Sequence, residues 1–192
     1  MPPKPRITRD DILNTALDIV RTEGEEALNA RHIAAVLQCS TQPVFSNFST
    51  MEELRQAVID AAYRRYRACL RREQESGRYP AYKASGMGYI HFAREEKELF
   101  RLLFMRDRSR EEIPAASDEI TEMAAAVQEL TGLSSDDAQL FHLEMWVYVH
   151  GIASMLATSY LEWDEAMISR ILTDAYLGLK KRYSEKESSS WT

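Results

Sequence analysis

The residues best suited to chemistry lie in one short polar stretch, Cys39–Thr50, with the sequence CSTQPVFSNFST. Uncharged polar side chains of this kind serve either as helix caps and turns or as hydrogen-bonding groups for the edges of nucleic-acid bases. Pro43 suits the first turn of a helix, where backbone N–H groups lack intrahelical acceptors. We therefore expect a short helix over Thr41–Asn47, capped by Ser40.

In a helix-turn-helix arrangement, this stretch would be able to contact the bases of a nucleic acid. Asn29–Leu37 predicts the first helix of the motif, and Gln38–Cys39 predicts the turn. Val44, Phe45 and Phe48 are expected to anchor the second helix to the core. The polar residues that this leaves outward are Thr41, Gln42, Pro43 and Ser46. A short helix with a polar amino-terminal end fits the major groove of DNA, whereas the alternative is a stretch of caps and turns alone.

Other chemistry receives less support from the sequence. His91 and Glu95 are one helical turn apart and could be two metal ligands, but a third would have to come from His142 or His150 through the fold. We expect no metal and no cofactor. Cys39 is interpreted as a small apolar residue, the alternative being an oxidation-sensitive thiol. With no nucleophile motif, we expect no catalytic residues and no enzyme.

Composition favours an all-α protein. Of the 192 residues, 45% are hydrophobic and 28% charged, with only seven glycines and six prolines. Residues 1–72 hold 11 Lys/Arg and 9 Asp/Glu, a balance of +2, and the remainder carries −8, which sums to the net charge of −6. A more basic front part indicates an anionic partner for that part of the chain. The two cysteines cannot form a disulfide scaffold.

A cytoplasmic location without membrane contact is expected. The amino terminus MPPKPRITRD lacks the apolar core of a signal peptide. The most apolar run, Leu140–Ala157, contains His142, Glu144 and His150, which are costly in lipid, so it predicts a buried helix.

The remaining elements follow from periodicity and capping signals. Thr8 and Asp11 predict a capping box for a first helix that ends at Gly24. Thr50 and Glu53 predict another capping box, at the start of the helix over residues 51–76. Later helices are expected over residues 51–76, 82–105 (as one helix or a broken pair), 117–130, 139–158 and 163–183. We expect three regions: a DNA-binding domain over 1–50, a helical regulatory and dimerisation domain over 51–183, and a disordered tail over 184–192.

The segment ALNARHIAAVLQCSTQPVFSNFSTMEELRQAV resembles the DNA-binding domain of the TetR family of bacterial transcriptional regulators. The later segments YIHFAREEKELFRLLF and HGIASMLATSYLEWDEAMISRIL resemble the regulatory domains of one branch of that family. The resemblance implies an all-α homodimer in which an N-terminal three-helix helix-turn-helix domain is joined by a long helix to a larger dimerisation and ligand-binding domain.

The resemblance also implies roles for individual residues. Those expected to approach bases are Arg31, Thr41, Gln42, Pro43 and Phe45. Those expected near phosphates are Asn29, Asn47 and the backbone around Thr50. The capping and outward residues Ser40 and Ser46 complete the candidate DNA-binding set. Lys4, Arg6 and Arg9 form either an arm that reaches the DNA or a solvated terminus.

Three positions depart from the family pattern. The turn usually carries glycine where this chain has Gln38, which predicts strain or a different path. Phe45 replaces a usual tyrosine, and Met51 replaces a common lysine, so two phosphate contacts are lost. We expect weaker non-specific affinity for DNA as a result.

The helix over residues 139–158 is apolar nearly all round and needs cover that a single chain has few helices to supply. A symmetric dimer would supply it and would present two reading helices to two half-sites. The candidate dimer-interface residues are Gly151, Ser154, Met155, Ile168, Ile171, Leu172, Ala175 and Leu179. The alternative is a monomer with these helices at its centre.

The same region is rich in aromatic and methionine side chains, most of which belong to the core. The family resemblance implies a ligand cavity among them for a small apolar or amphipathic effector. The candidate pocket residues are Tyr89, His91, Phe92, Phe104, His142, Met145, Trp146 and Tyr148.

These observations predict a ligand-responsive transcriptional regulator, a repressor, that binds a palindromic double-stranded DNA operator as a homodimer. The alternative is a helical protein–protein interaction module that has lost DNA binding.

Overall fold

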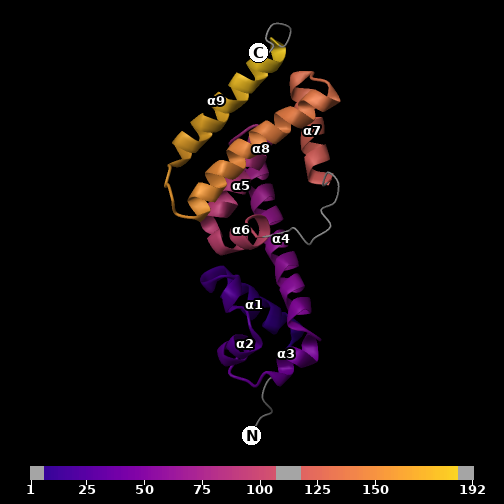
Figure 1. The fold of residues 1–192 in the computed structure, drawn as a ribbon, viewed down its shortest axis with the longest axis vertical. Coiled ribbons are helices and arrows are strands. Elements are labelled where there is room, and N and C mark those ends of the chain that lie inside the picture. Colours follow the sequence, from indigo (N-terminus) through magenta and orange to yellow (C-terminus); the bar gives the residue numbers. More distant parts are fainter. Residues whose placement is uncertain (1–6, 107–117, 186–192) are drawn as a thin grey trace. The chain divides into compact units, whose positions relative to one another are not determined.

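The computed structural model describes residues 7–106 and 118–185, and in this part of the chain all regular structure is helical (Figure 1). The all-α prediction is confirmed. In chain order the helices are α1 (Arg9–Glu23), the 3-10 helix η1 (Glu25–Ala27), α2 (Ala30–Val36), α3 (Gln42–Asn47), α4 (Met51–Glu75), α5 (Ala81–Glu95), α6 (Lys97–Phe104), α7 (Asp118–Thr131), α8 (Ser135–Ala157) and α9 (Glu165–Ser184). Most of the loop expected after residue 105, and residues 186–192 of the expected tail, lie outside the described residues.

The chain divides into two compact units. The first comprises Met1–Ala68 with Glu95–Arg106, and the second Cys69–Arg94 with Asp107–Thr192. Helix α4 therefore begins in the first unit and ends in the second, and α5 and α6 belong to different units. The expected domain limits, 1–50, 51–183 and 184–192, remain predictions.

Helix α1 forms as its capping residues predict. The hydroxyl of Thr8 accepts a hydrogen bond from the Asp11 N–H at 3.1 Å, and the Asp11 carboxylate accepts one from the Thr8 N–H at 2.9 Å. The Thr8 hydroxyl, which donates to the Asp11 carboxylate at 2.7 Å, and the Thr8 N–H lower the pKa of Asp11. Gly24 ends the helix at a φ of 88°, in the left-handed region that suits a glycine. Helix α1 packs against α2, α3 and α6 within the first unit.

The predicted helix-turn-helix is present as α2, a turn and α3. Asn29 caps α2 by accepting a hydrogen bond from the His32 N–H at 2.9 Å. Gln38 occupies the turn with a φ of 51°, so a side-chain-bearing residue adopts the left-handed conformation that glycine tolerates best. The expected cap at Ser40 is wrong: α3 begins at Gln42, and Thr41 stands at the cap position without a side-chain capping bond.

Helix α3 has only six residues and is held by its neighbours. Val44 and Phe48 are each 1% exposed and anchor it as expected. Phe45 is 50% exposed, so its expected anchoring role is wrong; at this helical position the ring points away from the core. The guanidinium of Arg9 lies 3.8 Å above the Phe48 ring, donates to the Asn47 carbonyl, and pairs with Glu53 at 2.9 Å.

Glu53 links the end of the motif to α4. The Glu53 N–H donates to the Thr50 hydroxyl at 3.0 Å, and the Glu53 carboxylate accepts from the Ser49 N–H at 2.7 Å. The expected capping pair is therefore present, with the carboxylate reaching one residue further back. The Ser49 N–H and the Arg9 guanidinium lower the pKa of Glu53.

The segment expected as one helix or a broken pair is a broken pair, α5 and α6, separated by Glu96. Glu96 is 8% exposed, and its carboxylate accepts from Arg21 of α1 at 2.5 Å and from Arg65 of α4 at 2.8 Å. A buried carboxylate needs such partners to offset its lost hydration. The pair raises the pKa of the Arg21 guanidinium.

In the second unit α8 packs against α7 and α9 (Figure 1). Phe141 and Met145 of α8 are buried with Val127 of α7 and Tyr183 of α9. Helix α8 begins one turn earlier than expected because the Ser134 hydroxyl caps it, accepting from the Asp137 N–H at 3.2 Å. Within residues 7–106 and 118–185, no helix is both long and apolar enough to span a membrane.

Two tyrosine–histidine pairs join α5 to α8. The Tyr82 hydroxyl lies 3.0 Å from His142 Nδ1, and the Tyr89 hydroxyl lies 2.9 Å from His150 Nδ1. Burial lowers the pKa of both histidines, because a charged imidazolium loses hydration there. The neutral imidazole is the form that can accept a hydrogen bond from a tyrosine hydroxyl.

Replacing Gln38 by glycine is expected to stabilise the protein by about 1 kcal/mol, because glycine removes the left-handed penalty of the turn. Thermal or urea unfolding of the Gln38→Gly variant measures the effect. Gln38→Ala retains the penalty and serves as the control. If the glycine variant is no more stable than the alanine variant, the backbone at Gln38 is not strained.

Stability is expected to fall as the pH drops below about 6.5, the unfolded histidine value. The folded pKa values of His142 and His150 are lowered, so the unfolded chain binds protons first, and stability is lost as pH falls through the folded values. Unfolding midpoints between pH 7.5 and 5.0 measure the loss. The double variant His142→Gln/His150→Gln should lose less stability than the wild type over this pH range. An equal loss of stability would show that groups other than these two histidines take up the protons.

Candidate nucleic-acid interface

The outward face of α3 presents uncharged side chains. Gln42, Phe45 and Ser46 are exposed, and Thr41 and Pro43 are partly exposed. The Ser46 hydroxyl donates to the Gln42 carbonyl at 2.9 Å. Among the described residues none hydrogen-bonds to the exposed Gln42 amide, so its donor and acceptor atoms are available to a partner. Of the five residues expected to approach bases, Gln42, Pro43 and Phe45 lie on α3 and Thr41 stands at its cap position, whereas Arg31 lies on α2.

Arg31 is distinguished from the other cations around this motif. Residues 7–60 contain four arginines, Arg9, Arg21, Arg31 and Arg55. Three are engaged by carboxylates: Arg9 by Glu53, Arg21 by Glu96, and Arg55 by Glu25 and Glu52. Arg31, exposed on α2, forms no hydrogen bond or ion pair with any described residue. Its guanidinium is available for an anion or a base.

The residues expected near phosphates also shape the local backbone. Asn29 caps α2 and donates to the Ala27 carbonyl at 3.2 Å. Asn47 donates to the Pro43 carbonyl at 2.8 Å. The Thr50 hydroxyl accepts from the Glu53 N–H. Ser40 and Thr50 are exposed, and Asn47 is partly exposed.

Arg9 is not part of an extended arm. Its guanidinium is fixed between Asn47, Phe48 and Glu53, and this position links the end of α3 to the start of α4. Lys4 and Arg6 lie outside the described residues.

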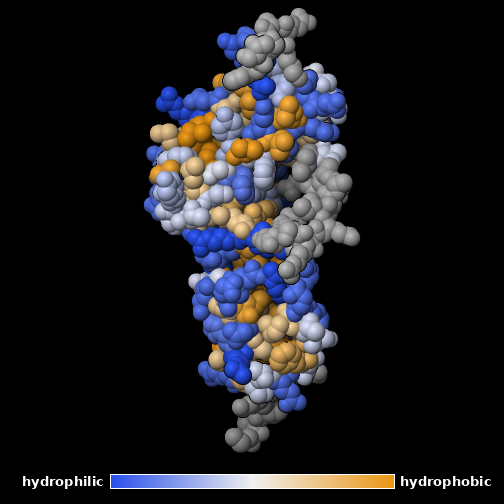
Figure 2. Space-filling model, viewed as in Figure 1, coloured by the Kyte–Doolittle hydropathy of each residue, from blue (hydrophilic) through white to orange (hydrophobic). Residues whose placement is uncertain are grey.

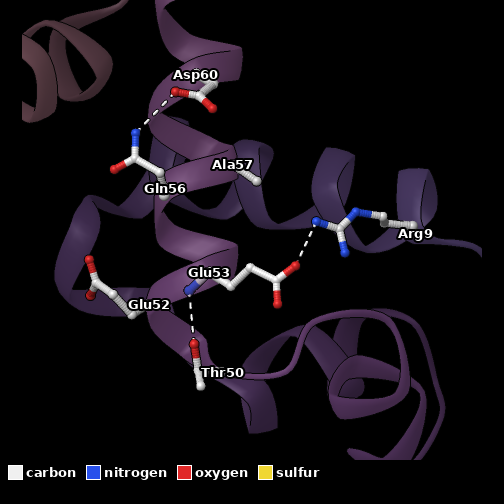
Figure 3. A pocket seen from close by; sticks show the side chains of 7 residues that line it. All are labelled: Arg9, Thr50, Glu52, Glu53, Gln56, Ala57 and Asp60. Atoms are coloured by element: carbon white, nitrogen blue, oxygen red, sulfur yellow. Dashed lines mark hydrogen bonds and ion pairs between the residues drawn. The ribbon is translucent and has the colours of Figure 1, made fainter.

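A shallow hollow lies beside the first turns of α4 (Figure 3). Its lining residues are Arg9, Thr50, Glu52, Glu53, Gln56, Ala57 and Asp60. Three of them are carboxylates, and the single guanidinium among them is paired with Glu53. This surface is unfavourable for phosphate, so a nucleic acid would contact the motif through α2 and α3 instead.

The candidate effector-pocket residues do not share one environment. Tyr89, Phe92 and Met145 are buried in the second unit. Trp146 and Tyr148 are 42% and 48% exposed, and Trp146 stacks on His150 with ring centroids 4.8 Å apart.

Two further members are placed by specific contacts. Phe104 belongs to the first unit, where it packs edge-on against Tyr63 and Tyr66. His142 is held by Tyr82. The eight residues therefore belong to two units, and a shared effector pocket stays a prediction.

His91 is instead part of a polar cluster in the second unit. Its Nδ1 lies 3.0 Å from Glu73 Oε2, and its Nε2 lies 4.0 Å from Glu165 Oε2. Arg78 reaches Glu73 at 3.4 Å and Glu165 at 3.2 Å. Glu73 is 1% exposed, and no described residue donates to its Oε1. Glu95, the other residue of the metal alternative, is exposed, and the described residues contain no group of three metal ligands.

The candidate dimer-interface residues divide between the core and the surface. Ile168 and Leu172 are buried within the unit at 0% and 3% exposure, so they cannot face another chain. The remaining members are partly exposed: Gly151, Ser154, Met155, Ile171, Ala175 and Leu179. Added methyl groups at Gly151 and Gly178 would meet no atom within 4 Å, so the surface there is open.

The sequence analysis did not assign the most exposed apolar residues of α8 and α9 to an interface. They are Leu140, Leu143, Trp146, Val147 and Tyr148 of α8 and Met167 and Leu177 of α9, each at least 42% exposed. Figure 2 shows apolar side chains reaching the surface over α8 and α9. The sequence indicated only that residues 139–158 are apolar nearly all round. It could not show which of these side chains pack against the same chain and which are exposed.

Comparisons with known proteins agree with this architecture. Residues 82–175 match the family model of the tetracyclin repressor-like C-terminal domain. The comparison with curated proteins gives no match.

Solved structures share the fold. A protein of unknown function from Rhodococcus sp. RHA1 matches with a TM-score of 0.70 and 20% identity, covering 95% of this chain and 99% of the other. A TetR-like transcriptional regulator from the same organism matches with a TM-score of 0.64 and 16% identity, covering 98% and 100%. The solved structures show the shared fold, and through its C-terminal domain match the chain belongs to the TetR family of transcriptional regulators.

Proposed function

We propose that this regulator is a ligand-responsive repressor that binds a palindromic operator as a homodimer. The proposal rests on two features of the same motif. Arg31 is exposed and has no partner among the described residues, and α3 presents outward-facing uncharged side chains that can contact bases. A cation positions the protein against phosphate or guanine, and uncharged polar groups distinguish base edges.

Packing supports the use of α3 as a rigid reader. Val44 and Phe48 are buried, and Arg9 fixes the carboxyl end of the helix. A base contact requires side chains held within a few tenths of an ångström, which a free six-residue helix could not provide.

The exposed apolar face of α8 supports dimerisation. Leu140, Leu143 and Val147 form a stripe at helical spacing, with Leu177 of α9 also exposed. A contiguous apolar face of this kind marks an interaction surface. A second copy of the chain would cover it with an identical face related by two-fold symmetry, and the same symmetry suits a palindrome.

The polar cluster of Glu73, Arg78, His91 and Glu165 supports the response to a ligand. The Glu73 Oε1 atom is buried and receives no hydrogen bond from any residue that the structure describes, which leaves this carboxylate oxygen unsatisfied there. An amphipathic effector with a hydrogen-bond donor would satisfy that atom. Binding would then favour one spacing of the two reading helices, and a spacing that does not fit successive major grooves would release the DNA.

A protein–protein interaction module is the second candidate function. The carboxylates of Glu52, Glu53 and Asp60 beside α4 favour it, because this part of the surface repels a phosphate backbone (Figure 3). Such a module would show no preference for any DNA sequence.

Arg31→Ala and Gln42→Ala are each expected to weaken operator binding by about 1–3 kcal/mol without unfolding the protein, because both side chains are exposed. Fluorescence anisotropy with DNA from upstream of the protein's own gene measures the affinity. Arg64→Ala is the matched control, since Arg64 is exposed about 20 Å along α4 from its first residue. Normal affinity in both variants would refute the assigned docking.

Val147→Glu is expected to convert the dimer to a monomer and to weaken operator binding with it. The side chain is 59% exposed in the single chain, so folding should survive, whereas a buried carboxylate at the interface is costly. Light scattering coupled to gel filtration measures the mass. Leu130→Glu, at a 52% exposed position of α7, is the control. A Val147→Glu dimer of unchanged stability would exclude this face.

A further inference from the structure

We infer that each operator half-site consists of A·T pairs where α3 enters the groove, with a guanine read by Arg31 to one side. This inference rests on the proposed DNA binding and adds the base content that the motif selects. It follows from the chemistry of the exposed side chains and from which of them are already engaged within the protein.

Gln42 favours adenine. Its amide is exposed at the first position of α3 and makes no hydrogen bond within the described structure. The amide can donate to the N7 acceptor of adenine and at the same time accept from its exocyclic N6 amine in the major groove. Guanine presents two acceptors there and leaves the amide oxygen unpaired.

Phe45 favours thymine. Half of its side chain is exposed, on the same helix and one turn from Gln42. An aromatic ring in the major groove gains most from an apolar base edge, and the thymine C5 methyl is the apolar group that base pairs present there. Thr41, partly exposed, adds a methyl group to the same end of the helix.

Helix α3 lacks the cationic donor that usually recognises guanine. The residues from Ser40 to Asn47 include no lysine or arginine, the side chains that pair with guanine O6 and N7. Ser46 and Asn47 direct their donors to the Gln42 and Pro43 carbonyls of their own helix. Arg31 is the arginine of residues 7–60 without a partner, and it lies on α2. A guanine contact is therefore expected from α2 and not from α3.

The first experiment is selection of binding sites from random duplex DNA with the purified full-length protein. We expect an enriched inverted repeat whose half-sites contain an A·T stretch flanked by a guanine. In Arg31→Ala the guanine preference should disappear while the A·T stretch remains. An enriched repeat with G·C pairs throughout the half-site would overturn the inference and leave the proposed DNA binding intact.

The second experiment replaces the thymines of the selected stretch by deoxyuridine, which removes only the C5 methyl groups. Wild-type affinity should fall about fourfold for each methyl in contact with Phe45. Phe45→Ala should bind the two DNAs equally, and Phe45→Tyr, which keeps the ring, should retain the wild-type difference. Thermal unfolding confirms that the variants fold.

The two experiments distinguish a failure of the inferred base contacts from a failure of the proposed DNA binding. Equal sensitivity to deoxyuridine in wild type and Phe45→Ala would overturn the thymine contact. Failure to enrich any site would remove the proposed DNA binding itself, because the inference requires a site to test.

Discussion

The reading function proposed for this chain depends on one constraint: a six-residue helix must be held rigidly by other parts of the protein. Such a helix is too short to be stable alone. Val44 and Phe48 supply burial, and Arg9 closes the carboxyl end by covering Phe48 and pairing with Glu53. Because Glu53 also caps the entry to α4, one ion pair connects α1, α3 and α4. The exposed readers can then point outward without contributing to the core.

Ion pairs within the protein determine which arginines remain available to bind another molecule. Glu53, Glu96 and Glu25 engage Arg9, Arg21 and Arg55, so three of the four arginines of residues 7–60 are paired within the protein. In the proposed DNA complex, less of the affinity would then come from phosphate attraction, and selectivity would rest on uncharged contacts. The departures from the TetR pattern at Phe45 and Met51 are expected to act in the same direction, since the resemblance implies that each removes a phosphate contact.

Local chemistry made much of this fold predictable. The Thr8–Asp11 capping box and the Asn29 cap follow from residues close in sequence, and the family pattern predicted strain or a different path at Gln38. Periodicity left open whether residues 82–105 form one helix or a broken pair. The partners of Arg9 and Glu96 could not be predicted, because they join residues 31 to 75 positions apart. Periodicity likewise placed Ile168 and Leu172 on a stripe without showing that their own chain covers it.

The most direct test of the central claim is the affinity of the full-length protein for a selected inverted repeat, measured by anisotropy over a range of salt concentrations against scrambled competitor. The account predicts saturable binding that resists the competitor and weakens linearly in a plot of log affinity against log salt. Binding that is no tighter than to scrambled DNA at every salt concentration would contradict it and favour the interaction module.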